Sequence, residues 1–567
     1  MRSKLLILLV MMILLLASCA PGRNSTSNSD VFPGAATVTP SQPLQNTLTA
    51  AATLVPTLVP SPTPYPVEKL VLWIDPAVPD QLSRELIFPE EIKKGASVGD
   101  ANIQLGINNE KSTGSEWVYA LVAPFPTIPD GVSLEDLRKA WAGGGNQNFE
   151  DRRILMSAST EAAFSTLWGA PSIKGIRVAN REDLLDLAWS TRPAWAIVPF
   201  ENLDPRWKVL QVGGMSPLDK HLNVSNYPLV IHFGFNGNEQ ELNALGSLQE
   251  QGLVVLPSSN RDVSRMTTLV MTGTTALVRA TAAKMDSNGV TYPARDIRDW
   301  LVNADLTHIS NEVSFAKTCP PGNPYQKDMQ FCSRPEYIGL LDYIGTDIVE
   351  LTGNHLGDWD WPPFLYTLDL YRQKGWYFYG AGENIERARA PIRLESNGNK
   401  IAFIGCRTGP PPVWATEMQP GGANCDFAYI EKQINHLKSD GYLPIMTFQY
   451  NESYQMTPLP AQKRDFGLVS DAGAFIVQGS QAHYPQGFEF RDDRFIHFGP
   501  GNLFFDQMNI PVMGTRREFI DRHVIYNGRL ISTELLTAML EDYCRPRPMT
   551  PDERISLLHD AFAASGW

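Results

Sequence analysis

The first hydrophobic feature of the chain is an unbroken apolar run from Leu5 to Leu16, preceded by the basic residues Arg2 and Lys4. A run of about a dozen residues is too short for the hydrocarbon core of a bilayer, which needs roughly 20 residues of helix. A short apolar run behind a basic start is typical of a signal peptide. The pattern therefore predicts export, and residues 1–19 take no part in the predicted fold.

Residues 20–66 have no periodic apolar face. They consist mainly of Ser, Thr, Pro, Asn and Ala and carry almost no charge. Proline cannot donate a backbone hydrogen bond, so this composition does not support a helix or a sheet. It predicts a disordered, polyproline-like tether between the signal peptide and the folded part.

Apolar runs of strand length alternate with helical stretches between residues 67 and 265. Residues 70–74, 118–122 and 196–199 are predicted strands, and 133–142 and 179–189 are predicted helices. Ser133 before two acidic residues is a good helix N-cap. Strand–helix alternation predicts an α/β domain with a largely parallel sheet.

The second folded region, residues 266–567, ends in a predicted helix. Thr550 is a suitable N-cap and Pro551 a suitable first helical residue, and the apolar pattern continues to Phe562. We expect this helix to pack on a sheet.

The residues that end the apolar run, Leu16-Ala-Ser-Cys19, match the lipobox of bacterial lipoproteins. The resemblance implies an acylated Cys19 that holds the chain on a membrane, since each buried methylene contributes about 0.8 kcal/mol. A cleaved signal peptide without lipid is the alternative. We expect an exported, membrane-anchored lipoprotein at the cell surface or in the periplasm.

Charge narrows the choice of partners. The chain has 48 Lys and Arg against 61 Asp and Glu, a net charge of −13. With no basic run, this composition predicts no binding of nucleic acid. An anionic polymer would need a local basic or metal-bearing pocket.

Five cysteines remain besides Cys19. Export permits disulfides, and the pairings local in sequence are Cys319 with Cys332 and Cys406 with Cys425. Buried free thiols are the alternative.

The first folded region resembles solute-binding proteins of the periplasmic phosphate-binding type. The resemblance is carried by residues 119–141, by Ala196-Ile-Val-Pro-Phe200 and by Trp207-Lys-Val-Leu-Gln-Val-Gly-Gly214. It implies a periplasmic-binding-protein-like α/β domain over residues 67–265. No ligand or ligand contact can be named from it, and a scaffold role without a ligand is equally open.

The second region resembles the CapA branch (poly-γ-glutamate and capsule synthesis) of the calcineurin-like metallophosphoesterases. Its landmarks follow in the family's order and spacing: Gly273–Arg279, Asn303–Glu312, Gly353–Asp358, Tyr379–Gly382, Lys400–Gly405, Phe448–Tyr454, Gly479–His483 and Gly501–Gln507. The resemblance implies a two-sheet α/β sandwich over residues 266–567, flanked by helices, with the site on loops at strand ends.

Enzymes of this family hold two metal ions, but only some of the matching positions here carry ligands. Glu312, Asn354, His355 and His483 stand at acidic, amide and imidazole positions. The other matching positions are substituted: Thr274 for Asp, and Gln449, Ser480 and Gln481 for His. A neutral amide is a poor ligand beside imidazole. The comparison predicts loss of the two-metal centre. It leaves open one divalent ion (Mn, Zn or Fe) on Glu312, His355 and His483, or a hydrogen-bonded polar cluster without metal.

Three functions follow as hypotheses. The first is a CapA-like surface protein that helps to make, anchor or bind a capsule polymer, with capsule-synthesis proteins as partners. The second is a metal-dependent hydrolase that uses the residual ligands. As other chemistry at the same site, Glu312, Glu452 and Asp506 could supply a carboxylate pair for general acid–base work. The third is a solute-binding or sensing lipoprotein. No catalytic residue is assigned.

Overall fold

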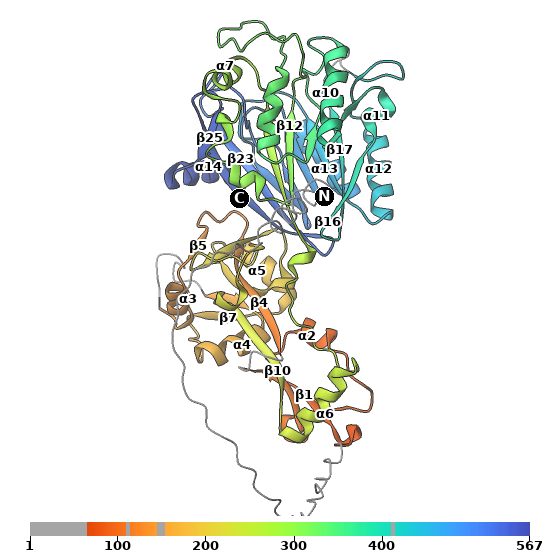
Figure 1. The fold of residues 1–567 in the computed structure, drawn as a ribbon. Coiled ribbons are helices and arrows are strands. Elements are labelled where there is room, and N and C mark those ends of the chain that lie inside the picture. The colour runs from red at the N-terminus through yellow and green to blue at the C-terminus, as the bar shows by residue number, and fades with distance from the viewer. Residues whose placement is uncertain (1–64, 109–113, 145–152, 410–413) are drawn as a thin grey trace, which may run out of the picture. The chain divides into compact units, whose positions relative to one another are not determined.

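The computed structural model describes residues 65–108, 114–144, 153–409 and 414–567 (Figure 1). The predicted signal peptide, Cys19 and nearly all of the predicted tether lie outside these ranges. Residues from Pro64 to Trp567 form one compact unit. Within the described ranges, no helix is both long and apolar enough to cross a membrane.

Residues 67–265 contain a ten-stranded sheet with the order β2-β1-β3-β10-β4-β8-β6-β7, in which β9 pairs with β4 and β5. Its strands are β1 (Val71–Ile74), β2 (Lys93–Lys94), β3 (Ile103–Ile107), β4 (Ser115–Pro124), β5 (Gly131–Val132), β6 (Ile154–Met156), β7 (Ile176–Val178), β8 (Trp195–Pro199), β9 (Trp207–Val212) and β10 (Val230–Gly237). Its helices are α2 (Asp80–Glu85), α3 (Leu134–Trp141), α4 (Ala158–Trp168), α5 (Leu184–Ser190) and α6 (Glu239–Glu250).

The α/β class is as predicted, but the expectation of a largely parallel sheet is wrong. The long central strand β4 runs antiparallel to β10, β8 and β9. Parallel pairing is confined to β1 with β2 and β3, β6 with β7 and β8, and β5 with β9. β4 is buried along nearly its whole length, and a buried strand has the same apolar pattern in either direction.

One helix boundary also differs from the prediction. The helix expected from residue 179 begins at Leu184, after a short 3-10 turn at Arg181–Asp183. Ala179 follows the last residue of β7, and its backbone N–H donates to the carbonyl of Met156 in the neighbouring strand β6. The predicted N-cap is confirmed, since the Ser133 side chain accepts from the backbone N–H of Asp136.

Residues 266–567 form two larger mixed sheets. The seven-stranded sheet has the order β14-β13-β12-β11-β23-β24-β25, and the six-stranded sheet has the order β16-β17-β19-β20-β22-β21. The first comprises β11 (Met266–Thr275), β12 (Leu306–Asn311), β13 (Ile348–Glu350), β14 (Tyr377–Tyr379), β23 (Arg517–Tyr526), β24 (Arg529–Glu541) and β25 (Arg545–Pro548). The second comprises β16 (Ile392–Ser396), β17 (Asn399–Arg407), β19 (Leu443–Gln449), β20 (Ile476–Ser480), β21 (Phe488–Arg491) and β22 (Arg494–His497), and a small pair joins β15 (Ala381–Gly382) to β18 (Gly421–Gly422).

The two larger sheets pack face to face, as the resemblance implied. One buried cluster joins Leu269 and Ile348 of the seven-stranded sheet to Phe403 and Ile445 of the six-stranded sheet. Figure 1 shows α10, α11 and α12 grouped beside β17, and α7 and α14 beside β25. The helices of this region are α7 (Arg279–Asn288), α8 (Arg298–Val302), α9 (Ile338–Tyr343), α10 (Trp361–Lys374), α11 (Ile385–Arg389), α12 (Phe427–Ser439), α13 (Pro460–Ala472) and α14 (Pro551–Ala564).

The C-terminal helix begins where the sequence predicts. The Thr550 side chain accepts from the backbone N–H of Glu553, and the Glu553 carboxylate accepts from the backbone N–H of Thr550. This reciprocal capping box satisfies two backbone donors that a helix start leaves unpaired. Leu557, Leu558 and Phe562 on α14 are buried in the cluster between the sheets.

The direction of the parallel strands determines where the landmark segments lie. β11, β12 and β13 run parallel in one sheet, and β17, β19 and β20 run parallel in the other. The carboxyl ends of parallel strands lie at one edge of a sheet, where loops gather. The landmark segments that follow these strands are therefore brought together.

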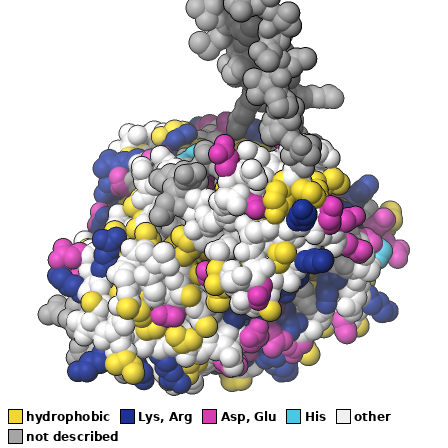
Figure 2. Space-filling model, turned by 90° about the horizontal axis from the view of Figure 1, so that it is seen from below, with side chains coloured by type: hydrophobic (Ala, Val, Ile, Leu, Met, Phe, Trp, Pro, Cys, Tyr) yellow, Lys and Arg dark blue, Asp and Glu magenta, His cyan; other side chains and the backbone are white. Residues whose placement is uncertain are grey.

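The structure contains two disulfides, Cys319–Cys332 and Cys406–Cys425, and Cys544 is a buried free thiol. Figure 2 shows one face of the molecule on which basic and acidic side chains are interspersed. That face offers no continuous basic track.

Candidate functional site

The strand ends bring most of the landmark residues into one polar cluster. Arg407, Gln449 and Ser480 are register partners in a row across β17, β19 and β20. Glu312 follows β12, and its backbone N–H donates to the carbonyl of Thr275 at the end of β11. We call this group, together with Asn354, Gln481 and the residues bonded to them, the strand-end cluster.

Three side-chain amides connect the two sheets. Nε2 of Gln449 donates to Oδ1 of Asn354 over 2.8 Å and to Oε1 of Gln481. The backbone N–H of Gln481 donates to Oγ1 of Thr274 over 3.4 Å. Gln449, at a position where the sequence comparison expects a histidine, thus bonds to both Asn354 and Gln481.

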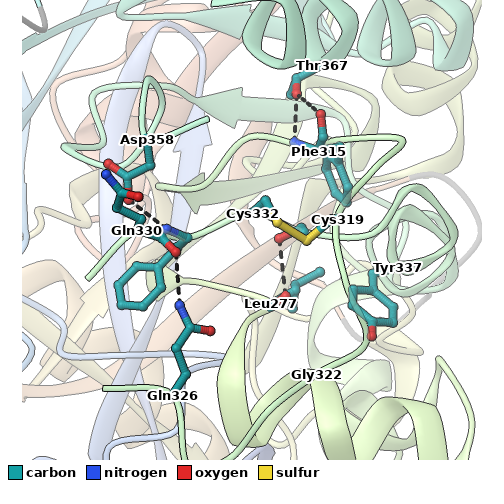
Figure 3. The surroundings of a disulfide bond; sticks show 12 residues. Leu277, Phe315, Cys319, Gly322, Gln326, Gln330, Cys332, Tyr337, Asp358 and Thr367 are labelled. Carbon is teal, nitrogen blue, oxygen red and sulfur yellow. Dashed lines mark hydrogen bonds between the residues drawn. A yellow bond between two sulfur atoms is a disulfide. The ribbon is translucent and has the colours of Figure 1, made fainter. Parts of the chain in front are cut away.

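His355 is hydrogen-bonded to Asp358, three residues further along the same turn. This contact is of the kind expected for a hydrogen-bonded polar cluster without metal. Its Nδ1 lies 2.7 Å from Oδ2 of Asp358, which also accepts from the backbone N–H of Phe331. Figure 3 shows Asp358 against the loop that the Cys319–Cys332 disulfide closes. Burial lowers the pKa of His355, but the hydrogen bond to Asp358 and the charges of Glu312 and Asp358 outweigh burial and raise it.

His483 lies in a separate set of contacts. Its Nδ1 is 2.8 Å from Oδ1 of Asn502, and its ring packs on Phe505. His483 and Gln481 have φ angles of 52° and 74°, in the left-handed region that non-glycine residues rarely adopt. Backbone strain of this kind persists where surrounding contacts fix the chain and is frequent at functional sites.

Arg279 and two phenylalanines lie between the histidines. The guanidinium is 5.0 Å from the ring centroid of Phe331 and 5.1 Å from that of Phe505, and these rings pack on His355 and His483 respectively. Neither histidine donates to or accepts from the other. The sequence brought both into one candidate ion site, but the structure gives each its own partners.

Two of the carboxylates proposed for acid–base chemistry, Asp506 and Glu452, have hydrogen-bond partners of their own. Asp506 accepts from Nε and Nη2 of Arg279 and from the backbone N–H of Ala280. Glu452 is exposed and accepts from the hydroxyl of Tyr454. Asp506 is paired with a guanidinium, so the structure gives no support to an acid–base role for Asp506, and for Glu312 and Glu452 that role stays a hypothesis. Tertiary packing brought Arg279 to Asp506, which spacing in the sequence did not predict.

Glu312 and Arg407 are the buried charges of the strand-end cluster, with 2 % and 5 % of their surface exposed. Oε2 of Glu312 and Nε of Arg407 have no hydrogen-bond partner among the described residues. Burial lowers the pKa of Arg407 to about 10, and the nearby Glu312 carboxylate acts in the opposite direction. Arg407 therefore keeps its positive charge at neutral pH.

These residues do not fit the two metal ions of calcineurin-like enzymes. Among the residues that the structure describes, no group of three or more His, Cys, Asp or Glu is arranged to hold a metal ion. The amide oxygens of Asn354 and Gln481 accept from Gln449, and Nη1 of Arg407 donates to the carbonyl of Gly353. These amide and carbonyl oxygens, which could bind a cation, are therefore already used as acceptors by the N–H groups of Gln449 and Arg407.

Sequence reasoning did not identify Arg407 as a site residue. A signal was available, because Arg407 is a charged residue at the carboxyl end of the apolar run Ile401–Cys406. Such strand ends face the site in folds with parallel strands.

The fold and the cluster define the class of protein: an α/β chain whose second region is a two-sheet sandwich with polar groups gathered at strand ends. Within that region, residues 268–507 match the family described as "Bacterial capsule synthesis protein PGA_cap".

Two curated relatives extend this match. The chain is 24 % identical over 261 residues to capsule biosynthesis protein CapA of Bacillus anthracis, covering 45 % of this chain and 63 % of the relative. It is 22 % identical over 202 residues to PGA biosynthesis protein CapA of Bacillus subtilis (strain 168), covering 35 % and 52 %. The chain thus spans less than two thirds of either relative.

Solved structures give weaker likenesses. An ABC-type phosphate transport receptor from Vibrio cholerae has a TM-score of 0.26 and 16 % identity, over 33 % of this chain and 100 % of the receptor. A putative 5′-nucleotidase from Staphylococcus aureus has a TM-score of 0.31 and 12 % identity, over 52 % and 58 %. Because both TM-scores are low, the description of the fold rests on the strand order and pairing of this chain alone.

Proposed function

We propose that this chain is an extracytoplasmic CapA-like protein that takes part in making, anchoring or binding a capsule polymer of poly-γ-glutamate type. A lipid on Cys19 would hold it at the membrane, and its strand-end cluster would act without the two-metal centre. The observation that carries the proposal is the match of residues 268–507 to the capsule-synthesis family.

The chemistry of the cluster is compatible with a carboxylate-rich polymer. The whole chain is acidic, so a polyanion needs local hydrogen-bond donors and positive charge. Arg407 supplies a buried guanidinium, and His355 an imidazole whose pKa is raised. Both lie at the strand ends, where the loops meet.

Complementation tests the proposal. The chain, with its own N-terminus, is expressed in a poly-γ-glutamate-producing Bacillus subtilis strain that lacks its CapA. We expect cell-associated or secreted polymer to be restored, and an Arg407→Ala/His355→Ala variant to restore less at equal expression. Normal export of the chain with no polymer would contradict the proposal.

A second arm tests binding and anchoring. The purified chain should cosediment with poly-γ-glutamate, with less retained on a neutral polymer of similar length. The wild-type chain should fractionate with membranes, whereas Cys19→Ser should release it. Phosphodiesterase activity that depends on added manganese and is lost in His355→Ala would instead favour the metal-dependent hydrolase.

A further inference from the structure

We infer that a carboxylate-binding subsite lies beside the strand-end cluster, in a pocket where the Arg389 guanidinium receives a pendant carboxylate of a γ-linked glutamyl chain. We call this cavity the α11 pocket. The inference rests on the proposed function for the identity of the ligand, and it adds a place of contact outside the cluster.

The α11 pocket is a cavity of about 420 Å³ between α11 and the segment 414–424. Cavities of roughly 300–1,000 Å³, with apolar walls and a few polar groups, are typical of small-molecule sites. Among the described residues that line the pocket, Arg389 alone carries a charge. The walls are formed mainly by Ile385, Arg389, Trp414, Thr416, Gln419 and Asn424.

The guanidinium of Arg389 is held in one orientation by its neighbours. Its Nη2 donates to Oδ1 of Asn424 over 2.6 Å, and its Cζ lies 5.1 Å from the ring centroid of Tyr429. Oδ2 of Asp426 lies 3.6 Å from the same Nη2, but the Asp426 side chain is 42 % exposed and does not line the pocket. A planar guanidinium fixed in this way loses little further freedom when it binds a ligand.

Two N–H donors of the lining residues have no hydrogen-bond partner among the described residues. They are the buried nitrogens Nε of Arg389 and Nε1 of Trp414. A guanidinium and an indole can only donate, so the group that satisfies them must be an acceptor. A carboxylate is the acceptor best matched to a guanidinium, because its hydrogen bonds are charge-assisted. The pocket therefore favours an anion.

The other walls suit the rest of a glutamyl unit. Each unit of a γ-linked chain carries a pendant carboxylate, a short run of methylenes and an amide. The Ile385 side chain and the Trp414 ring give apolar surface for methylenes, and Thr416 and Gln419 add a hydroxyl and an amide of the kind that bond to a peptide group.

One short segment joins the α11 pocket to the strand-end cluster. Asn424 lines the pocket, whereas the carbonyl of the preceding Ala423 accepts from the backbone N–H of Arg407. The Cys406–Cys425 disulfide ties this segment to β17. A polymer that carries a carboxylate on every unit offers ligands to the pocket and to the cluster alike.

Calorimetric titration of the purified full chain with a short γ-linked glutamate oligomer tests the pocket. Arg389→Gln removes the guanidinium, and we expect it to weaken binding about tenfold. Trp414→Phe keeps an aromatic wall and removes only the N–H, and it should weaken binding about threefold. Melting temperatures show whether each variant is folded, and Trp414→Phe keeps the test decisive if Arg389→Gln is not.

Arg387→Gln is the matched control, because Arg387 is an exposed cation on the same helix that does not line the pocket. It should change binding by less than about twofold. An equal loss of binding in this control would show that general charge, and not the pocket, attracts the oligomer.

Two comparison ligands test the chemistry of the occupant. The methyl ester of the oligomer has no charge and should bind at least about tenfold more weakly. An oligogalacturonate carries its carboxylates on sugar rings and should also bind more weakly. The inference is overturned if the wild-type chain does not bind the glutamyl oligomer, or if either comparison ligand binds as tightly.

Failure of this inference and failure of the proposed function are distinguishable. If the wild-type chain restores polymer in the CapA-deficient strain while folded Arg389→Gln and Trp414→Phe variants bind the oligomer as wild type does, only the pocket assignment falls. If the wild-type chain restores no polymer, the proposed function falls, and the titration still decides whether the pocket takes a glutamyl carboxylate.

Discussion

Three buried histidines show how strongly burial affects the pKa of an imidazole. His308, His497 and His523 are fully buried, and each uses a ring nitrogen in a hydrogen bond: to Tyr379, to Asp521 and to Thr533, respectively. Burial lowers the pKa of His523 to about 4 and that of His308 to about 3. Both imidazoles are therefore neutral in the folded chain at pH 7.

The first prediction concerns His523. Its folded pKa lies below the unfolded value near 6.5, so the unfolded state takes up the proton first as pH falls. Stability from neutral His523 is present above pH 6.5 and is lost as pH falls toward about 4. The difference in unfolding free energy between wild type and His523→Asn should shrink by on the order of 3 kcal/mol across that window.

Denaturant unfolding at several pH values measures this difference. The exposed His221 is the matched control, and His221→Asn should keep a constant difference from wild type. A constant difference for His523→Asn as well would show that the imidazole is not kept neutral by burial.

At the scale of elements, loops fixed by disulfides orient the site. The Cys319–Cys332 loop carries Phe331, whose backbone N–H donates to Asp358, and Asp358 bonds to His355 (Figure 3). The disulfide that constrains this loop therefore also helps to position the imidazole of His355, through the carboxylate of Asp358.

The second prediction removes that constraint. Cys319→Ser/Cys332→Ser opens a loop of sequence separation 13 and should lower the unfolding free energy by about 3 kcal/mol. Hydrogen exchange at Phe331 should accelerate, because its bond to Asp358 loses its support. Exchange in β24 should change only as far as the lower free energy of global unfolding requires, since β24 does not pair with this loop. Unchanged exchange at Phe331 would show that the loop is held without the disulfide.

At the scale of the whole molecule, one aromatic side chain links regions distant in sequence. Phe125, just after β4, lies in the core cluster of residues 266–567, within 5.1–6.1 Å of Phe488, Phe490, Phe495, Phe562 and Trp567 between ring centroids. Aromatic contacts at such distances add to the free energy of apolar burial.

The third prediction tests this link. Phe125→Ala should lower the unfolding free energy by roughly 3–5 kcal/mol, because it removes a fully enclosed ring. Hydrogen exchange should rise in both β4 and β22, which belong to different sheets. The half-buried Phe88 is the control, and Phe88→Ala should affect neither β22 nor α14. A change confined to β4 would show that the two regions unfold independently.

The sequence alone determined the features that depend on neighbours in the chain. Strands at 118–122 and 196–199, the caps at Ser133 and Thr550, and the α/β class follow from local pattern and backbone hydrogen bonding. The order of motifs placed Glu312, Asn354, His355 and His483 at loops after strands, because parallel strands direct their carboxyl ends to one edge.

Only the tertiary structure decided which groups meet. The antiparallel direction of β4, the bond of Gln449 to Asn354 across 95 residues, and the binding of Asp506 by Arg279 all depend on packing between distant segments. A sequence pattern indicates which positions are buried. It does not indicate the direction in which a buried strand runs, or which distant side chain a buried polar group will bond to. The strand-end cluster was therefore located from sequence, whereas the hydrogen bonds that join its side chains emerged only when the sheets were packed.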